Sequence, residues 1–150
     1  MILPLSGMDK PAFIPGGSFA DERGELCFVN EASLVGVQRF YILSNAWGKR
    51  VRAWQGHKKE AKYFFALEGS FLIAVIKIDD FANPSPGLKP DIYILEAAQP
   101  QILFVPAGHA NGIQALSPAN RLLVFSTLTL EESAADTYRF SPELWYDWNE

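Results

Sequence analysis

Short runs of β-forming residues, bounded by glycine, proline and charged turn residues, recur along most of the chain. Several of these runs alternate between apolar and polar positions, which is the period of a strand with one buried face. The pattern predicts strands at residues 26–30, 37–43, 51–55, 63–67, 71–78, 91–95, 101–105, 112–116 and 121–127. Short strands at such regular spacing favour an all-β sandwich or barrel.

Turn and cap signals add detail to this picture. Glu68, Gly69 and Ser70 separate two strong strand signals and predict a tight β-hairpin. Residues 80–90 hold three prolines and are expected to form an exposed loop. Helical patterns occur at residues 130–135 and 142–148, the second introduced by Ser141 as N-cap and Pro142 as first helical residue.

The composition narrows the class of protein. With 150 residues, 49% of them hydrophobic, the chain suits a single domain over residues 1–150 with a substantial core. Its one cysteine excludes an intrachain disulfide and a cysteine-based zinc site. A net charge of −4 argues against a nucleic-acid partner. No targeting segment or membrane-spanning run is visible, so we expect a cytoplasmic protein without membrane contact.

The densest polar run, RVRAWQGHKKEAK, lies at residues 50–62, directly before the aromatic run YFFAL. A solvated basic loop would explain such a composition. An anion pocket would explain it as well, because arginine offers a two-pronged donor for phosphate or carboxylate and lysine offers a point charge. The composition of the run leaves both possibilities open.

Two spacings in the chain match the motifs of cupin barrels. Where cupins carry His-x-His and a glutamate before a glycine, this chain reads Gln55, His57 and Lys62. Their second motif, Pro-x-Gly-x-x-His, reads PAGHAN, with His109 expected at the exposed barrel mouth and Asn111 replacing the last histidine. The resemblance thus implies that Gln55, Lys62 and Asn111 stand at metal-ligand positions. Because a lysine ammonium repels a divalent cation, we expect no metal.

Longer segments extend this resemblance over most of the chain. They are DERG at 21–24, RFYIL at 39–43, RAWQGHKKEAKYFFALEG at 52–69, VPAGHANGI at 105–113 and FSTLTLEES at 125–133. In this order they resemble the dTDP-4-dehydrorhamnose 3,5-epimerases and the dTDP-sugar 3,4-ketoisomerases, which are metal-free cupins. The resemblance implies a double-stranded β-helix (a cupin jelly-roll barrel) with a short C-terminal helix. It also implies a homodimer, a nucleotide-sugar substrate and no cofactor.

The resemblance also assigns roles to individual residues. Arg52 would hold the diphosphate and Lys62 would stabilise an enolate. Gln55 stands where the epimerases carry their catalytic base, and an amide cannot accept a proton at neutral pH. His57 shares a strand face with Gln55 and is therefore predicted to be the base, while Tyr41 is the candidate acid. The predicted site thus comprises catalytic His57, Lys62 and Tyr41 and substrate-binding Arg52, Gln55 and Asn111.

Three functions are compatible with these residues. The first is a metal-free epimerase or ketoisomerase that acts on a dTDP-linked 4-keto-6-deoxy sugar in surface polysaccharide biosynthesis. The second is a cupin that binds a nucleotide-sugar or carbohydrate without catalysis, which the replacement at Gln55 favours. A metal-dependent cupin is disfavoured by Gln55, Lys62 and Asn111. The sequence leaves open which sugar and which carbon are involved.

Overall fold

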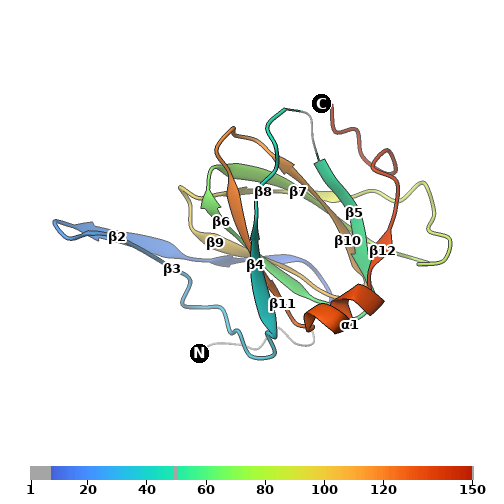
Figure 1. Cartoon of the computed structure of the whole chain (residues 1–150), viewed down its shortest axis with the longest axis horizontal. Coiled ribbons are helices and arrows are strands. Elements are labelled where there is room, and N and C mark those ends of the chain that lie inside the picture. The colour runs from blue at the N-terminus through green and yellow to red at the C-terminus, as the bar shows by residue number, and fades with distance from the viewer. Residues whose placement is uncertain (1–7, 49–50, 150) are drawn as a thin grey trace.

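Two antiparallel β-sheets packed face to face form the body of the molecule (Figure 1). The computed structural model describes residues 8–48 and 51–149. The first sheet has the order β1 (Ala12–Pro15), β9 (Gln101–Val105), β6 (Lys62–Glu68), β11 (Arg121–Ser126) and β4 (Arg39–Leu43). The second has the order β12 (Tyr138–Arg139), β5 (Val51–His57), β10 (His109–Ala115), β7 (Ser70–Lys77) and β8 (Asp91–Glu96). The predicted all-β jelly-roll architecture is confirmed.

A separate hairpin of β2 (Gly17–Asp21) and β3 (Gly24–Phe28) projects away from this body (Figure 1). Arg23 and Asp21 form an ion pair at its turn, with 2.7 Å between the guanidinium and the carboxylate. Phe19 and Leu26 are cross-strand partners and are both exposed. The hairpin therefore presents apolar side chains to solvent.

The main core lies between the two sheets and consists of side chains that alternate inward along each strand. Phe64 on β6, Phe71 on β7, Leu103 on β9 and Leu122 on β11 are completely buried there. These inward residues are the apolar positions of the alternating strand patterns in the sequence. Burying them requires two facing sheets, because each sheet has one apolar face to cover.

The predicted hairpin across Gly69 is wrong. β6 pairs with β11 and β9, whereas β7 pairs with β10 and β8, so the turn connects one sheet to the other. Gly69 has a φ of 73°, and a Cβ there would clash with Ser117 Oγ and the Ala119 carbonyl oxygen. The crossing places Phe64 and Phe71 in one core cluster between the sheets. A hairpin would have set both runs in a single sheet.

The predicted helix at residues 142–148 is also wrong, since this segment is irregular and lies over the outer face of the second sheet. Trp54 Nε1 donates to the Leu144 carbonyl at 2.8 Å, and Gln114 Nε2 donates to the Trp148 carbonyl at 2.9 Å. Because these contacts occupy backbone carbonyls and bury Trp148, they outweigh the local helix signal. The predicted helix at 130–135 is confirmed as α1 (Leu130–Ala135), capped by Thr129.

Most other sequence predictions agree with the structure. Residues 80–90 form an irregular loop as expected, and the remaining predicted strands are present with small shifts at their ends. Strands β1, β2 and β12 had not been predicted. Within the described residues, no helix is long and apolar enough to cross a bilayer. Arg50, part of the polar run, lies outside the described residues.

Candidate functional site

A cavity of about 310 Å³ opens between the two sheets, where β4 and β5 face each other. Its walls combine cationic and neutral polar side chains with two aliphatic ones. None of the described residues that line it carries a carboxylate. The lining residues are Arg39, Tyr41 and Leu43 of β4, Arg52 and Gln55 of β5, Lys62 of β6, and Asn111 and Ile113 of β10. The cavity is therefore suited to an anionic or strongly polar ligand.

Strand alternation and register bring these side chains together. Gln55 and Asn111 are cross-strand partners on β5 and β10, so both project from the inner face of the second sheet. Arg39 and Tyr41 project from β4 in the opposite sheet, with the guanidinium carbon 5.1 Å from the centre of the Tyr41 ring. Burial raises the pKa of Tyr41 to about 12, and the charge of Glu60 adds to the effect. The phenol therefore keeps its proton at neutral pH.

Arg52 is fixed at the exposed side of the cavity. Its Nε donates to Asn45 Oδ1 at 2.7 Å, and its Nη2 donates to the Ser44 carbonyl at 3.1 Å. Asn45 is itself buried and donates to the Ile113 carbonyl at 3.0 Å. This chain of hydrogen bonds orients the guanidinium while leaving it accessible to solvent.

Lys62 is the least exposed cation of the cavity, with 5% of its surface accessible. In the described part of the chain, no carboxylate lies within 4.0 Å of its amine. Burial lowers the pKa of Lys62, and the charges of Arg39 and Arg139 act in the same direction, while Glu60 opposes them. The lowered pKa of Lys62 means that its surroundings favour the neutral amine more than water does.

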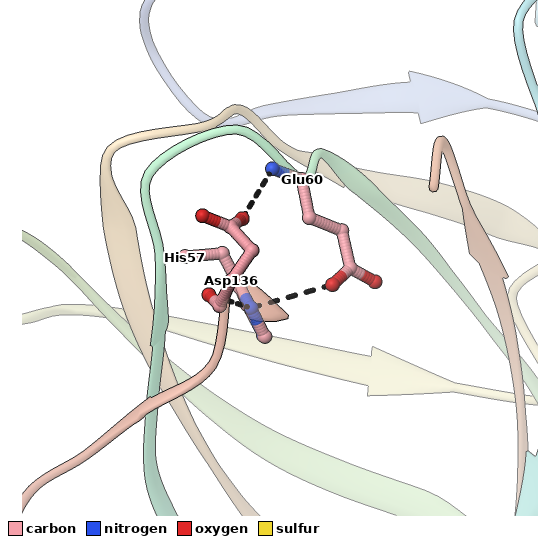
Figure 2. A group of neighbouring side chains, drawn as sticks. All are labelled: His57, Glu60 and Asp136. Carbon is pink, nitrogen blue, oxygen red and sulfur yellow. Dashed lines mark hydrogen bonds and ion pairs between the residues drawn. The ribbon is translucent and has the colours of Figure 1, made fainter. Parts of the chain in front are cut away.

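His57 is the one predicted site residue that is not part of the cavity lining. Its ring Nδ1 lies 3.1 Å from the Asp136 carbonyl oxygen and 3.3 Å from Glu60 Oε1 (Figure 2). Its Nε2 is buried and has no hydrogen-bond partner among the described residues. Burial lowers the pKa of His57, and the charge of Lys62 contributes. These contacts favour a neutral ring whose Nδ1–H donates to the Asp136 carbonyl.

Sequence reasoning missed the buried carboxylate of Glu60, which is fully inaccessible to solvent. Its oxygens accept from Ser126 Oγ at 2.5 Å and from Ser133 Oγ at 2.6 Å. Arg39 Nη2 lies 3.7 Å away. The only signal in the sequence was a lone acidic residue within a basic run, and its partners lie more than sixty residues along the chain.

Asp136 was missed as well. Its carboxylate accepts from the backbone N–H groups of Lys58, Lys59 and Glu60 at 2.9 to 3.2 Å and so fastens the turn between β5 and β6. His57, Glu60 and Asp136 place potential ligand atoms within 4.8 Å of one another (Figure 2). Each carboxylate already accepts hydrogen bonds from donors of the chain, which describes a hydrogen-bonded cluster better than a cation site.

His109 differs from its expected position at the exposed barrel mouth. Only 6% of its surface is accessible, and its Nδ1 lies 3.1 Å from the Pro106 carbonyl oxygen. It borders a second cavity of about 560 Å³. Burial lowers the pKa of His109 as it does that of His57.

The two buried histidines predict how stability depends on pH. Because their folded-state pKa values lie below the unfolded value of 6.5, the unfolded chain binds protons first as the pH falls. The stabilisation that comes from the two neutral histidines is therefore expected to be fully present above pH 6.5. Below that pH, the free energy of unfolding should decline. Urea denaturation at several pH values measures the decline. His57→Gln and His109→Gln should each reduce its slope, and an unchanged slope in the double variant would contradict the assignment.

A family model provides the first comparison with known proteins. The model described as WxcM-like, C-terminal matches residues 12–141, which is most of the chain. The chain belongs to this WxcM-like C-terminal family. A search of curated proteins finds no match.

Solved structures with the same fold agree with this membership. QdtA, a sugar 3,4-ketoisomerase from Thermoanaerobacterium thermosaccharolyticum in complex with TDP, is 20% identical, with a TM-score of 0.67 over 89% of this chain and 90% of that one. The rmlC epimerase of Mycobacterium tuberculosis is 18% identical, with a TM-score of 0.71 over 92% and 74%. The WlaRB TDP-quinovose 3,4-ketoisomerase of Campylobacter jejuni is 18% identical, with a TM-score of 0.65 over 89% and 95%. The family resemblance predicted from the motifs is confirmed.

Proposed function

We propose that this WxcM-like protein is a metal-independent isomerase, either an epimerase or a 3,4-ketoisomerase, that acts on a dTDP-linked 4-keto-6-deoxy sugar. The observation that carries the proposal is the cavity itself, where Arg39, Arg52 and Lys62 converge without a lining carboxylate among the described residues. Solved relatives support the ligand class, since one QdtA variant is described in complex with TDP-4-keto-6-deoxyglucose.

The dimensions and charge of the cavity suggest how such a substrate binds. At about 310 Å³ it is at the small end of ligand pockets, which suits a hexose better than a complete nucleotide-sugar. We therefore place the sugar inside and the diphosphate at the exposed side, where Arg52 presents its guanidinium. Gln55 and Asn111 would bind sugar hydroxyl groups. The cationic side chains that line the cavity repel a divalent metal ion, which supports a reaction without one.

The proposed reaction moves a proton at a carbon next to a ketone. It needs a base, a positive group or donor for the enolate oxygen, and an acid. Arg39 and Lys62 offer positive charge, and Tyr41 offers a phenol that stays protonated at neutral pH. His57 is the base proposed from the sequence, and its unpartnered Nε2 is chemically suited to that role.

A binding protein without catalysis is the second candidate. Two observations favour it, namely the amide of Gln55 in the cavity wall and the absence of exposed surface at His57 Nε2. Such a protein would bind the nucleotide-sugar as tightly as the enzyme but would leave its carbon-bound hydrogens in place.

Solvent-deuterium exchange into a dTDP-4-keto-6-deoxy sugar separates the two candidates. NMR should show exchange at a carbon beside the ketone, followed by an epimer or a shifted ketone, in samples treated with chelator. Exchange that requires added metal would contradict the metal-independent reaction. Tight binding of dTDP without exchange would establish the binding protein, and absence of binding would overturn both.

Arg52→Ala tests the orientation of the substrate. Loss of a charged hydrogen bond costs about 1.5 to 3 kcal/mol, so the Kd for dTDP should rise about 10- to 150-fold in calorimetry. Arg121→Ala is the matched control, because Arg121 is exposed and does not line the cavity. An equal effect of the two substitutions would refute the proposed diphosphate position.

We also propose that the protein is a cytoplasmic homodimer that contributes to surface polysaccharide biosynthesis. The dimer is supported by β4, an edge strand whose outward residues Phe40 and Ile42 are 63% and 45% exposed. An apolar edge strand of this kind is a common site of pairing between chains. Sedimentation equilibrium measures the mass in solution and tests the dimer.

A further inference from the structure

A second cavity, of about 560 Å³, lies where the segment before β1 meets the C-terminal end of β7 and the N-terminal ends of β8 and β10. Among the described residues it shares no lining residue with the first cavity, the one between β4 and β5. His109 is the one buried polar residue in the described part of its wall. This second cavity is therefore named the His109 cavity.

His109 presents a hydrogen-bond acceptor to the cavity. Its Nδ1 lies 3.1 Å from the Pro106 carbonyl oxygen and 3.2 Å from that of Ala107. Because carbonyl oxygens only accept, Nδ1 carries the hydrogen and the neutral ring keeps a lone pair on Nε2. No described residue forms a hydrogen bond with Nε2, and this atom is not closed off from solvent as His57 Nε2 is. The lone pair of a side chain that is only 6% exposed is thus available to a ligand in the cavity.

Charged side chains of both signs surround this acceptor. They are three lysines and two aspartates, namely Lys10, Lys77, Lys89, Asp9 and Asp91. Within the described residues, no ion pair of 4.0 Å or less involves any of them. Burial is the largest cause of the lowered pKa of His109, and the charges of Lys77 and Asp9 act on it in opposite directions, so both lie near the ring. The wall therefore offers cations and acceptors that the described part of the chain leaves unpaired.

We propose that the His109 cavity is a second ligand site and that it binds a sugar phosphate. The lysine ammonium groups bind the phosphate, which is the usual partner of such point charges. The sugar hydroxyls donate to His109 Nε2 and to the aspartate carboxylates, while Pro11 and the half-buried Tyr93 provide apolar surface for the sugar ring. The volume lies within the range of about 300–1,000 Å³ that is usual for small-molecule sites. This site is separate from the proposed isomerase and does not depend on it.

The composition of the wall fits a sugar phosphate better than a bare anion or a metal ion. A bare anion would use the lysines but would be repelled by the carboxylates of Asp9 and Asp91. A divalent cation would be repelled by the lysines. In the described part of the chain, Asp9, Asp91 and His109 also do not place their potential ligand atoms within 4.8 Å of one another. A sugar phosphate, by contrast, uses both the cations and the acceptors.

NMR of the histidine side chains tests the site, because the chain contains only two histidines. We expect glucose 1-phosphate or glucose 6-phosphate to cause a saturable shift of the His109 Nε2 resonance, which the spectrum of His109→Gln assigns. Neutral glucose and inorganic phosphate each carry half of the recognised groups and should bind about 10-fold more weakly or worse. Absence of a saturable shift with both sugar phosphates would overturn the proposal. Equal affinity for inorganic phosphate would also overturn it.

Three variants show in which cavity the sugar phosphate binds. Lys77→Ala should raise its Kd by about 10-fold or more, as expected for loss of a charged hydrogen bond. Lys59→Ala is the matched control, because Lys59 is exposed and lines neither cavity, and it should keep the wild-type Kd. Arg52→Ala alters the first cavity and should also leave the Kd unchanged. Equal Kd values for Lys77→Ala and Lys59→Ala, or loss of binding in Arg52→Ala alone, would refute the assignment to the His109 cavity.

Discussion

Replacement of Glu60 with alanine is expected to lower the free energy of unfolding by about 3 to 5 kcal/mol, the usual cost of breaking a buried charged network. Glu60 is completely buried and accepts from the hydroxyls of Ser126 and Ser133. Its removal would take away the acceptor of the Ser133 hydroxyl, one of the two acceptors of the Ser126 hydroxyl, and the charge partner of the nearby Arg39 guanidinium. Urea denaturation monitored by tryptophan fluorescence measures the loss.

Two further variants make this expectation specific. Glu60→Gln keeps the volume and one acceptor oxygen, so it should cost less than alanine. Glu31→Ala removes an exposed carboxylate and should change the stability by less than about 0.5 kcal/mol. Equal stability of the Glu60→Ala and Glu31→Ala proteins would show that the buried cluster does not stabilise the fold.

The second large effect is expected at Gly69, where the chain crosses from one sheet to the other. Alanine there must adopt a φ of 73°, which costs about 1 to 2 kcal/mol for a residue with a Cβ. The new methyl group would also clash with the Ala119 carbonyl oxygen, and overpacking of this kind costs about 1 to 3 kcal/mol more. The midpoint of urea denaturation should therefore fall clearly in Gly69→Ala.

Two other glycines separate these contributions. Gly108 has a φ of 87° but nothing within 4 Å of the position that a methyl group would take, so Gly108→Ala should show the backbone cost alone. Gly87 has open space as well and lies in the irregular loop, so Gly87→Ala should be close to neutral. If Gly69→Ala were no worse than Gly108→Ala, the close approach at the crossing would not be a source of instability.

The fold was largely predictable because a strand with one buried face shows in the local sequence as alternating apolar and polar residues. Alternating apolar residues marked β6, β7, β9 and β11 to within one or two positions. The two-residue strand β12 is too short to show such alternation, and it is defined by its pairing with Gly56 and Gln55 of β5. The wrong hairpin has a related cause. The signal at Gly69 identified a turn, and a turn signal does not state which strands will pair across it.

The cavity was predicted better than the hydrogen-bonded cluster of His57, Glu60 and Asp136. Five of the six expected site residues line it. Strand alternation and the motif frame account for most of them, whereas Arg52 shares the face of Gln55 because the pairing of β5 with β10 shifts register between these two residues. His57 followed the same alternation, yet the turn that leads to Glu60 and the hydrogen bonds to Asp136 hold it away from the cavity surface. Those contacts join residues more than seventy positions apart. No local pattern records such contacts.

The sequence by itself determined the strand pattern, the all-β class, the family and the residue types of the cationic cavity. All of these depend on the alternation of apolar and polar side chains and on the spacing of motif residues, and both can be read directly from the sequence. Only the tertiary structure decided that β6 and β7 belong to different sheets, that residues 142–148 cover a sheet without forming a helix, and that Glu60 is buried. Each of these depends on contacts between distant segments, because burial and hydrogen bonding are satisfied over the whole fold rather than within one segment.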